Sequence, residues 1–159
     1  MKIAIIYASK YGTTERVAGL IADKLRESND ITLIPLKDNP NPDIGGFETV
    51  ILGTPVYAGQ ANKKMKSFCA ANEAALLQKE SGLFVCGMEP DPAKRAKELE
   101  DAYPAVLRKS AKATGFLGGA FLFEEMNFAE RFIIKKIAKT DQSVHRILQD
   151  EIDAFVQQF

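Results

Sequence analysis

Hydroxyl-bearing residues and a glycine stand together early in the chain, between an apolar run and an amphipathic stretch. This first segment comprises Ser9, Lys10, Tyr11, Gly12, Thr13 and Thr14. If a helix begins here, its first N–H groups lack intrahelical partners and its dipole favours negative charge, so the hydroxyls could donate to phosphate oxygens. Glycine also lets the backbone approach a ligand closely. The segment predicts an anion site, and an ordinary helix cap after a turn is the alternative.

A second candidate segment follows the apolar run that ends at Gly53. It comprises Thr54, Pro55, Val56, Tyr57, Ala58 and Gly59. Proline keeps the residue before it in extended backbone, and a tyrosine offers a flat face to a flat ring. Glycine tolerates positive φ, so the peptide that precedes it can reorient. A simple turn with Tyr57 over the core is the alternative.

A third candidate segment follows the next apolar run. It comprises Cys86, Gly87, Met88 and Glu89. The glycine leaves room for a ligand, and a methionine can pack on an aromatic ring. Taken alone, this segment favours a plain connection to the next helix.

Apolar runs alternate with amphipathic stretches along the chain, which predicts strands and helices in turn. Strands are expected at 2–7, 31–36, 49–53, 82–86 and 115–123. Helices are expected at 13–27, 61–77 and 93–112, the last interrupted at Pro104. A final helix is expected to carry the apolar stripe Val144, Ile147, Leu148, Ile152, Phe155, Val156 and Phe159. Pro35 within the second strand predicts a sheet edge there.

This alternation predicts an α/β fold in which helices cover both faces of a parallel sheet. The length of 159 residues suits a single domain over 1–159. Right-handed crossovers and this length favour five strands in the order 2-1-3-4-5. A ligand is then expected at the carboxyl ends of the first and third strands, where the winding reverses. All three candidate segments fall at that edge.

Composition argues against several classes of function. Lys and Arg total 21 and Asp and Glu total 21, so no net field would attract nucleic acid. Cys69 and Cys86 lack metal-ligand spacing and are expected to be reduced core residues, and His145 is expected to be solvated and not a ligand. No apolar run reaches the roughly 20 residues of a membrane span, and no signal peptide precedes the first strand, so a cytoplasmic protein is expected.

The three segments resemble those of the flavodoxin family, in which a hydroxyl-rich phosphate loop is followed by two loops that enclose a flavin ring. The first segment is similar to the family's T/S-x-T-G-x-T loop, with Tyr11 where a threonine is usual. The resemblance extends over essentially the whole chain. It implies a flavodoxin-like three-layer fold, FMN as the cofactor held by all three segments, and electron transfer through the bound flavin.

The same resemblance assigns roles within the segments. Tyr57 is expected against one face of the ring, and a backbone carbonyl at 58–59 near its N5 atom. Backbone N–H groups of 86–89 are expected to hold the pyrimidine end. No nucleophile–base pair is found in the sequence, and none is needed, because the flavin performs the chemistry.

Within the family, the chain is most similar to the group that includes the menaquinone-dependent protoporphyrinogen dehydrogenases. The similarity lies in 116–120 and in the aromatic and basic residues of 127–136, and in a neutral net charge where small carriers are acidic. Glu124 and Glu125 depart from that group, which is richer in basic residues there.

Three readings of the function stay open at this point. The first is an electron carrier that docks to redox partner proteins. The second is an enzyme that passes electrons from a porphyrinogen to a quinone, and the third is a flavin-dependent quinone reductase. A phosphorylated receiver domain is excluded, because Tyr7-Ala8-Ser9 and Gly53-Thr54-Pro55 offer no carboxylate as acceptor.

The stretch from Phe128 to Lys139 interleaves aromatic and aliphatic residues with lysines and an arginine. It predicts an amphipathic helix, which would either touch the inner face of a membrane or approach a quinone. The alternative is a helix packed on the sheet whose lysines reach out to water.

Overall fold

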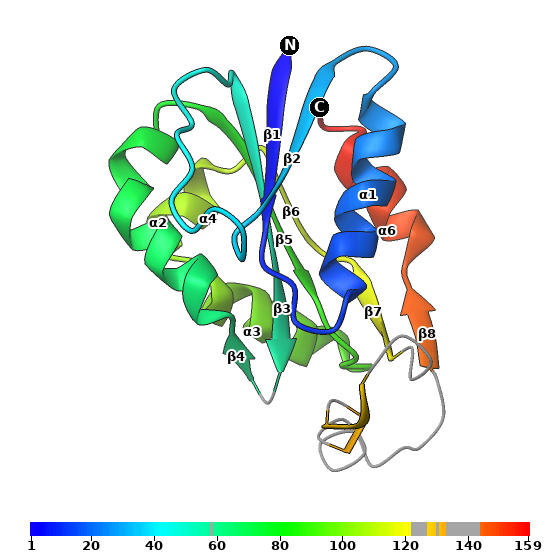
Figure 1. Cartoon of the computed structure of the whole chain (residues 1–159). Helices are drawn as coiled ribbons and strands as arrows, with labels where there is room; N and C mark the ends of the chain where they lie inside the picture. Colours follow the sequence, from blue (N-terminus) through cyan, green and yellow to red (C-terminus); the bar gives the residue numbers. More distant parts are fainter. Residues whose placement is uncertain (58, 122–126, 130, 133–143) are drawn as a thin grey trace.

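A computed structural model describes residues 1–57, 59–121, 127–129, 131–132 and 144–159. Its central sheet has the order β2-β1-β3-β5-β6, and all four pairings between these strands are parallel (Figure 1). The strands are β1 (Lys2–Tyr7), β2 (Asp30–Pro35), β3 (Thr49–Tyr57), β5 (Glu80–Cys86) and β6 (Ala113–Phe116). The predicted order 2-1-3-4-5 is confirmed, and β2 with its Pro35 lies at the expected edge.

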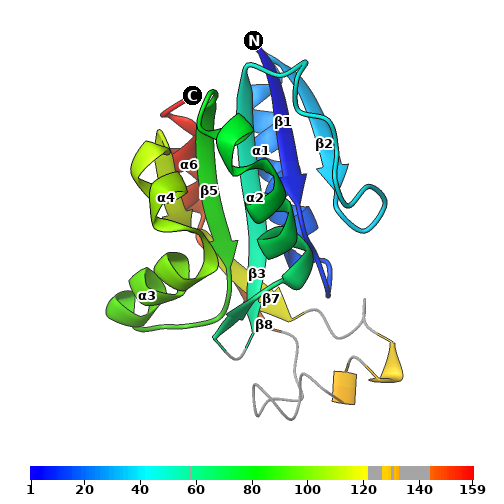
Figure 2. The same cartoon turned by 90° about the vertical axis from the view of Figure 1, so that its left-hand side faces the viewer.

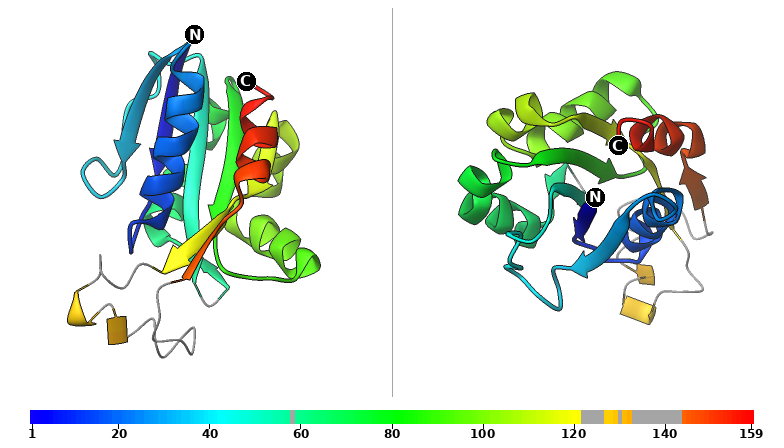
Figure 3. Two further views of the ribbon diagram at one scale, coloured as in Figure 1. Left: turned by 90° about the vertical axis from the view of Figure 1, so that its right-hand side faces the viewer. Right: turned by 90° about the horizontal axis from the view of Figure 1, so that it is seen from above.

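Helices cover both faces of this sheet. On one face lie α1 (Thr13–Leu25) and α6 (Gln149–Val156), as the left panel of Figure 3 shows. On the other lie α2 (Lys63–Leu76), α3 (Pro92–Ala102) and α4 (Ala105–Ser110) (Figure 2). The view from above in Figure 3 shows the resulting three layers.

The apolar residues of the strands supply a core on each face of the sheet. In β1, Ile3 and Ile5 pack under α1 and α6, whereas Ala4 and Ile6 pack under α2, and all four are fully buried. Side chains alternate between the faces of a strand, so a strand covered on both sides must be apolar throughout. The continuous apolar runs of the sequence have this cause.

Close packing between β3 and β5 requires a glycine at position 53. The Phe84 ring of β5 lies directly over Gly53 of β3, so that a Cβ at this position would overlap the ring. The ring also contacts Phe155 of α6, edge to face, with centroids 6.0 Å apart. The glycine on β3 thus makes room for the phenylalanine ring of β5.

Tyr103 ties the break between α3 and α4 to the middle of the sheet. It precedes Pro104, where the predicted helix over 93–112 is divided in two. Its buried hydroxyl shares its proton between the carbonyls of Phe84, at 2.7 Å, and Leu52, at 3.0 Å. These two contacts fix the α3–α4 corner against β3 and β5.

The second candidate segment forms a hairpin that the sequence did not predict. β3 continues to Tyr57, beyond the expected end at 53, and pairs antiparallel with β4 (Gln60–Ala61). Helix α2 consequently begins at Lys63, two residues later than expected. β5 begins at Glu80, two residues earlier than expected.

The fifth predicted strand, over 115–123, divides in two. β6 ends at Phe116, and Gly118 then adopts φ 84°, a conformation that turns the chain away from the sheet. β7 (Gly118–Phe121) pairs antiparallel with β8 (Val144–Ile147) outside the main sheet. The kink requires glycine, because positive φ disfavours any residue with a Cβ.

The expectation of a helix from Val144 is wrong, because 144–147 form strand β8 and α6 begins only at Gln149. Val144, Ile147 and Leu148 fit a helical stripe, yet Val144 and Ile147 pair with β7 as part of a strand, and Leu148 is the N-cap of α6. From Ile152 to Val156 the predicted helix is confirmed. The side chain of His145 lies outside what the structure describes.

Most of the amphipathic stretch from Phe128 to Lys139 also lies outside the described residues. Within it, the Arg131 N–H donates to the Asn127 carbonyl at 3.0 Å, as in one turn of helix. Phe128 and Phe132 are 86% and 61% exposed. Among the described residues, no helix combines the length and apolar character needed to cross a bilayer.

Replacing Tyr103 with phenylalanine should lower the free energy of unfolding by about 1–2 kcal/mol, because two buried carbonyls lose their shared donor. Urea denaturation of the apoprotein would measure this. Tyr11→Phe is a matched control: its buried hydroxyl has no hydrogen-bond partner among the described residues, so its removal should cost nothing. Equal losses in both variants would contradict the assignment.

Candidate functional site

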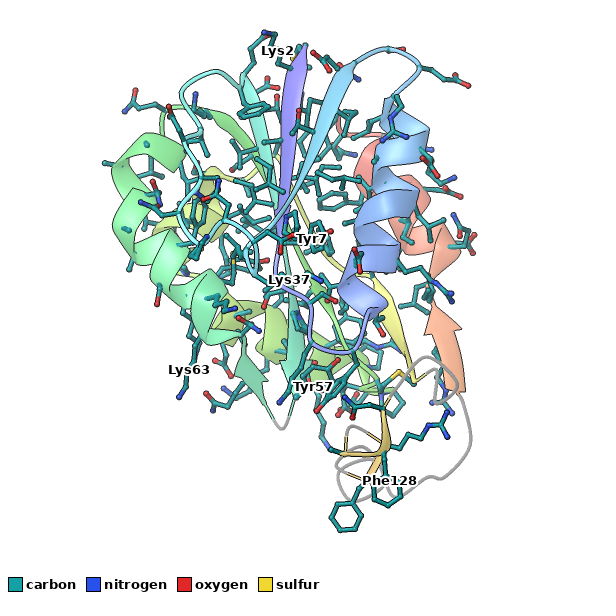
Figure 4. All side chains as sticks on the ribbon, viewed as in Figure 1. Lys2, Tyr7, Lys37, Tyr57, Lys63 and Phe128 are labelled. Atoms are coloured by element: carbon teal, nitrogen blue, oxygen red, sulfur yellow. The ribbon has the colours of Figure 1, made fainter. Side chains whose placement is uncertain are left out.

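The three candidate segments meet at the carboxyl-terminal edge of the sheet, at the bottom of the view in Figure 4. The rings of Tyr11 and Tyr57 touch edge to face, with centroids 5.1 Å apart, which joins the first segment to the second. Cys86 stands beside Pro55 in the β3–β5 register, which joins the second to the third. The structure thus brings together segments that are separated by about thirty to forty residues in the sequence.

The first segment forms the entry to α1. Gly12 is the N-cap residue with φ 88°, and no side-chain hydrogen bond caps the helix. The Gly12 carbonyl accepts the Arg16 N–H, so that the helix is regular from its first turn. The N-terminal end of α1 therefore presents the backbone donors and the positive dipole that an anion site uses.

Three buried hydroxyls near this helix end have no hydrogen-bond partner in the described part of the chain. Ser9 Oγ and Tyr11 Oη are buried and accept or donate no hydrogen bond within the part of the chain that the structure describes. Thr14 Oγ1 is equally buried, and its interaction with the Cys86 thiol opposes the larger effect of burial on the pKa of that thiol. Buried polar atoms are normally satisfied, so three such hydroxyls at one helix N-terminus fit a phosphate group.

The second segment divides into structural and surface residues. The Thr54 hydroxyl accepts the Asn62 N–H and donates to the Pro55 carbonyl, both at 3.2 Å, so it holds the β3–β4 hairpin together. Val56 is buried in the core under α2. Tyr57 remains half-buried, and Gly59 follows with φ 76°. Ala58 lies outside the described residues.

The third segment is covered by β7. Gly87 donates its N–H to the Gly118 carbonyl at 3.0 Å, and a Cβ at Gly119 would lie 2.8 Å from the Gly87 carbonyl oxygen. Met88 and Glu89 are half-buried. Cys86 is buried, and burial raises the pKa of its thiol to about 12, so it stays protonated. That these residues bind a cofactor stays a prediction.

A charged cluster next to the third segment was not predicted. The Arg95 Nε donates to the Glu89 carbonyl at 2.6 Å, and its guanidinium lies 5.1 Å from the centre of the Phe116 ring. Glu98 Oε2 is buried and has no partner among the described residues. Burial, reinforced by Glu89, raises the pKa of Glu98 above its ordinary value, against the opposing charge of Arg95.

A cleft of about 570 Å³ opens between the first and second segments, on the α2 side of the sheet. Four lysines contribute to its walls, which consist of Ala8, Ser9, Lys10, Lys37, Pro55, Tyr57, Gln60, Ala61, Asn62, Lys63 and Lys64. Figure 4 labels Lys37, Tyr57 and Lys63 around this region. Only Ser9, Lys10, Pro55 and Tyr57 of this lining belong to the predicted site.

Neither cysteine belongs to a metal centre in the described part of the chain, where no three His, Cys, Asp or Glu side chains gather as ligands. Cys69 and Cys86 are both buried free thiols. Cys69 lies on the buried face of α2, and Cys86, at the end of β5, packs beneath α1. Their expected place in the core is confirmed.

Comparison with known proteins agrees with this architecture. The model of the flavodoxin domain matches residues 4–146 of the chain. The chain belongs to the flavodoxin family. A flavodoxin of Clostridium saccharobutylicum is 37% identical over 70 residues, which are 43% of this chain and 44% of that protein. The match therefore spans less than half of the clostridial flavodoxin.

Solved flavodoxins share the fold. A Fusobacterium nucleatum flavodoxin bound to flavin mononucleotide is 24% identical with a TM-score of 0.53, over 71% of this chain and 68% of that one. A short-chain flavodoxin associated with a bacterial microcompartment is 15% identical with a TM-score of 0.57, over 89% and 99%. The expected flavodoxin-like fold is thereby confirmed.

Glu98→Gln should stabilise the apoprotein at neutral pH. Because folding raises the pKa of Glu98, the folded state holds this proton more tightly, and stability falls as pH rises above the ordinary value of 4.5. Glutamine is never ionised and avoids that loss. The variant should therefore unfold at a higher temperature than the unaltered protein at pH 7, and this difference should vanish below pH 4.5.

The control is Glu27→Gln in the exposed turn after α1, which should change stability little at either pH. A Glu98→Gln variant that is less stable than the unaltered protein at pH 7 would mean that the carboxylate is paired in the folded protein.

Proposed function

We propose that this chain binds FMN at the carboxyl-terminal edge of the sheet and carries electrons between redox partners. The observation that carries the proposal is the set of buried, unsatisfied hydroxyls of Ser9, Tyr11 and Thr14 at the N-terminus of α1. Membership of the flavodoxin family and the FMN bound by the Fusobacterium relative support the choice of cofactor.

The first segment would hold the phosphate. Ser9 and Thr14 donate from their hydroxyls, and the first N–H groups of α1 donate from the backbone. Tyr11 replaces the threonine usual at its position, and its hydroxyl is the donor available there. Burial strengthens these hydrogen bonds, because water does not compete for the same oxygens.

The other two segments would hold the ring. Tyr57 keeps one side exposed and offers a face for stacking. The positive φ of Gly59 allows the preceding peptide to change orientation and so to present its carbonyl or its N–H. Backbone N–H groups of 86–89 would hold the far side of the ring, apart from the Gly87 N–H, which already donates to the Gly118 carbonyl. When bound, FMN supplies the exchange of one or two electrons, and the protein positions it.

Thr14→Val separates cofactor binding from folding. The substitution keeps the shape of the side chain and removes a hydroxyl that has no hydrogen-bond partner among the described residues, so the apoprotein should be as stable or more stable. FMN affinity should fall about tenfold or more, because a hydrogen bond to a charged phosphate is lost. Visible absorption during FMN titration would measure this.

Thr32→Val on the exposed edge strand β2 is the matched control and should leave FMN affinity unchanged. Unperturbed flavin bands on mixing FMN with the unaltered protein would overturn the proposal, and would make the three segments structural turns.

A more specific proposal is that the protein contacts an apolar electron acceptor. Phe128 and Phe132 are strongly exposed, which favours contact of this segment with a membrane surface or a quinone. A dehydrogenase of the protoporphyrinogen-to-quinone type or a quinone reductase would use such a contact. The subgroup and these activities rest on the sequence resemblance alone.

Co-sedimentation with anionic liposomes at low salt tests the membrane contact. The bound fraction should drop when Phe128 and Phe132 are both replaced by serine, because two exposed aromatic rings are lost. Leu33→Ser on β2 removes an exposed apolar side chain elsewhere and should have no effect. Absence of binding by the unaltered protein would remove the membrane contact from the reading.

A further inference from the structure

Four lysines from three separate parts of the chain converge on the 570 Å³ cleft beside Tyr57. Lys10 comes from the segment after β1, and Lys37 follows β2. Lys63 and Lys64 are the first two residues of α2. Each of the four is exposed at its position.

Among the described residues, no acidic side chain lines this cleft, although the chain as a whole has as many acidic as basic residues, 21 of each. None of the four ammonium groups forms an ion pair with a carboxylate of the described residues. Glu15 lies at a neighbouring cavity of about 80 Å³, which Lys10 and Lys37 also line, and it accepts the Tyr7 hydroxyl at 3.3 Å. The positive charge is therefore concentrated locally without a paired carboxylate in the described part of the chain, and the Lys10 ammonium lies 5.4 Å from the centre of the Tyr11 ring.

The beginning of α2 adds to this concentration. Helix N-termini favour acidic residues because of the dipole, yet the first turn of α2 contains no acidic residue and begins with two lysines. The Asn62 side chain caps the helix by accepting the Lys64 N–H at 2.9 Å, so the helix forms in spite of these charges. A local arrangement that opposes helix stability is expected where function requires it.

We propose that this cleft binds a phosphate-bearing small molecule beside the phosphate loop of the flavin, with which the cleft shares Ser9 and Lys10. Its volume lies within the range of small-molecule sites, and lysine is a common phosphate ligand. Gln60 and Asn62 add polar groups that can orient such a ligand, and Tyr57 forms the wall that the cleft shares with the flavin site. The ligand would therefore lie next to the cofactor.

Isothermal titration of the FMN-loaded protein with inorganic pyrophosphate tests the proposal. Binding should be measurable at low salt and should weaken as sodium chloride is added, because exposed charges are screened. The visible spectrum of bound FMN, recorded in parallel, should keep its bound form throughout. A spectrum that returns to that of free FMN would mean that pyrophosphate competes for the flavin phosphate site, and this would overturn the proposal.

Charge-removing variants locate the binding. Lys37→Gln and Lys64→Gln should each weaken pyrophosphate binding about two- to fivefold, the size expected for one exposed charge pair. Lys109→Gln removes an exposed charge on α4, outside the lining of the cleft, and should leave binding unchanged. Equal effects of all three variants, or no binding of pyrophosphate at low salt, would overturn the proposal.

The proposal for the cleft and the proposal for FMN can be contradicted independently of each other. If FMN does not bind, the proposed function fails, and the same pyrophosphate titration of the apoprotein with the same variants still decides whether the lysine cleft is an anion site.

Discussion

The arrangement of this molecule depends on the burial of β3 between β1 and β5. Eight of its nine residues are buried, and Phe84 of β5 can pack against it only because position 53 has no side chain. Parallel pairing on both sides aligns the carboxyl ends of the three strands, so the segments that follow them must share one edge. The candidate site is a consequence of this pairing, and Tyr103 and the Thr54 hydroxyl hold it in place.

The same edge contains the groups that contribute least to stability. Within the described residues, the hydroxyls of Ser9, Tyr11 and Thr14 are buried without hydrogen bonds and Glu98 has an unpaired buried oxygen, while lysines cluster around a cleft. Each of these features disfavours the folded apoprotein, whereas the two cores beneath the helices are apolar and closely packed. Their concentration at one end of the sheet is what a binding site would produce, since a ligand could satisfy groups that the protein leaves unsatisfied.

Much of the candidate site could be predicted, because a phosphate loop is local in sequence. Hydroxyls, a glycine and a helix start stand together in 9–14, and the structure keeps them together. The roles of Thr54 and Lys37 could not be predicted in this way. Thr54 reaches Asn62 only because β3 extends into a hairpin, and Lys37 reaches the cleft only because β2 pairs beside β1. Two lysines at the start of α2 were a signal of charge accumulation that the sequence did contain.

The sequence by itself determined the five parallel strands, their order and the faces of the helices, because burial on both sides of a sheet imposes apolar runs and helical stripes that can be read directly. Only the tertiary structure decided the conformation of 144–147. Its apolar spacing suits a helix and a strand equally, and the free edge of β7, turned outward at Gly118, supplies the backbone partners that make it a strand. Likewise, only folding could concentrate positive charge in a chain of zero net charge, because distance in space and not in sequence sets the strength of electrostatic interactions.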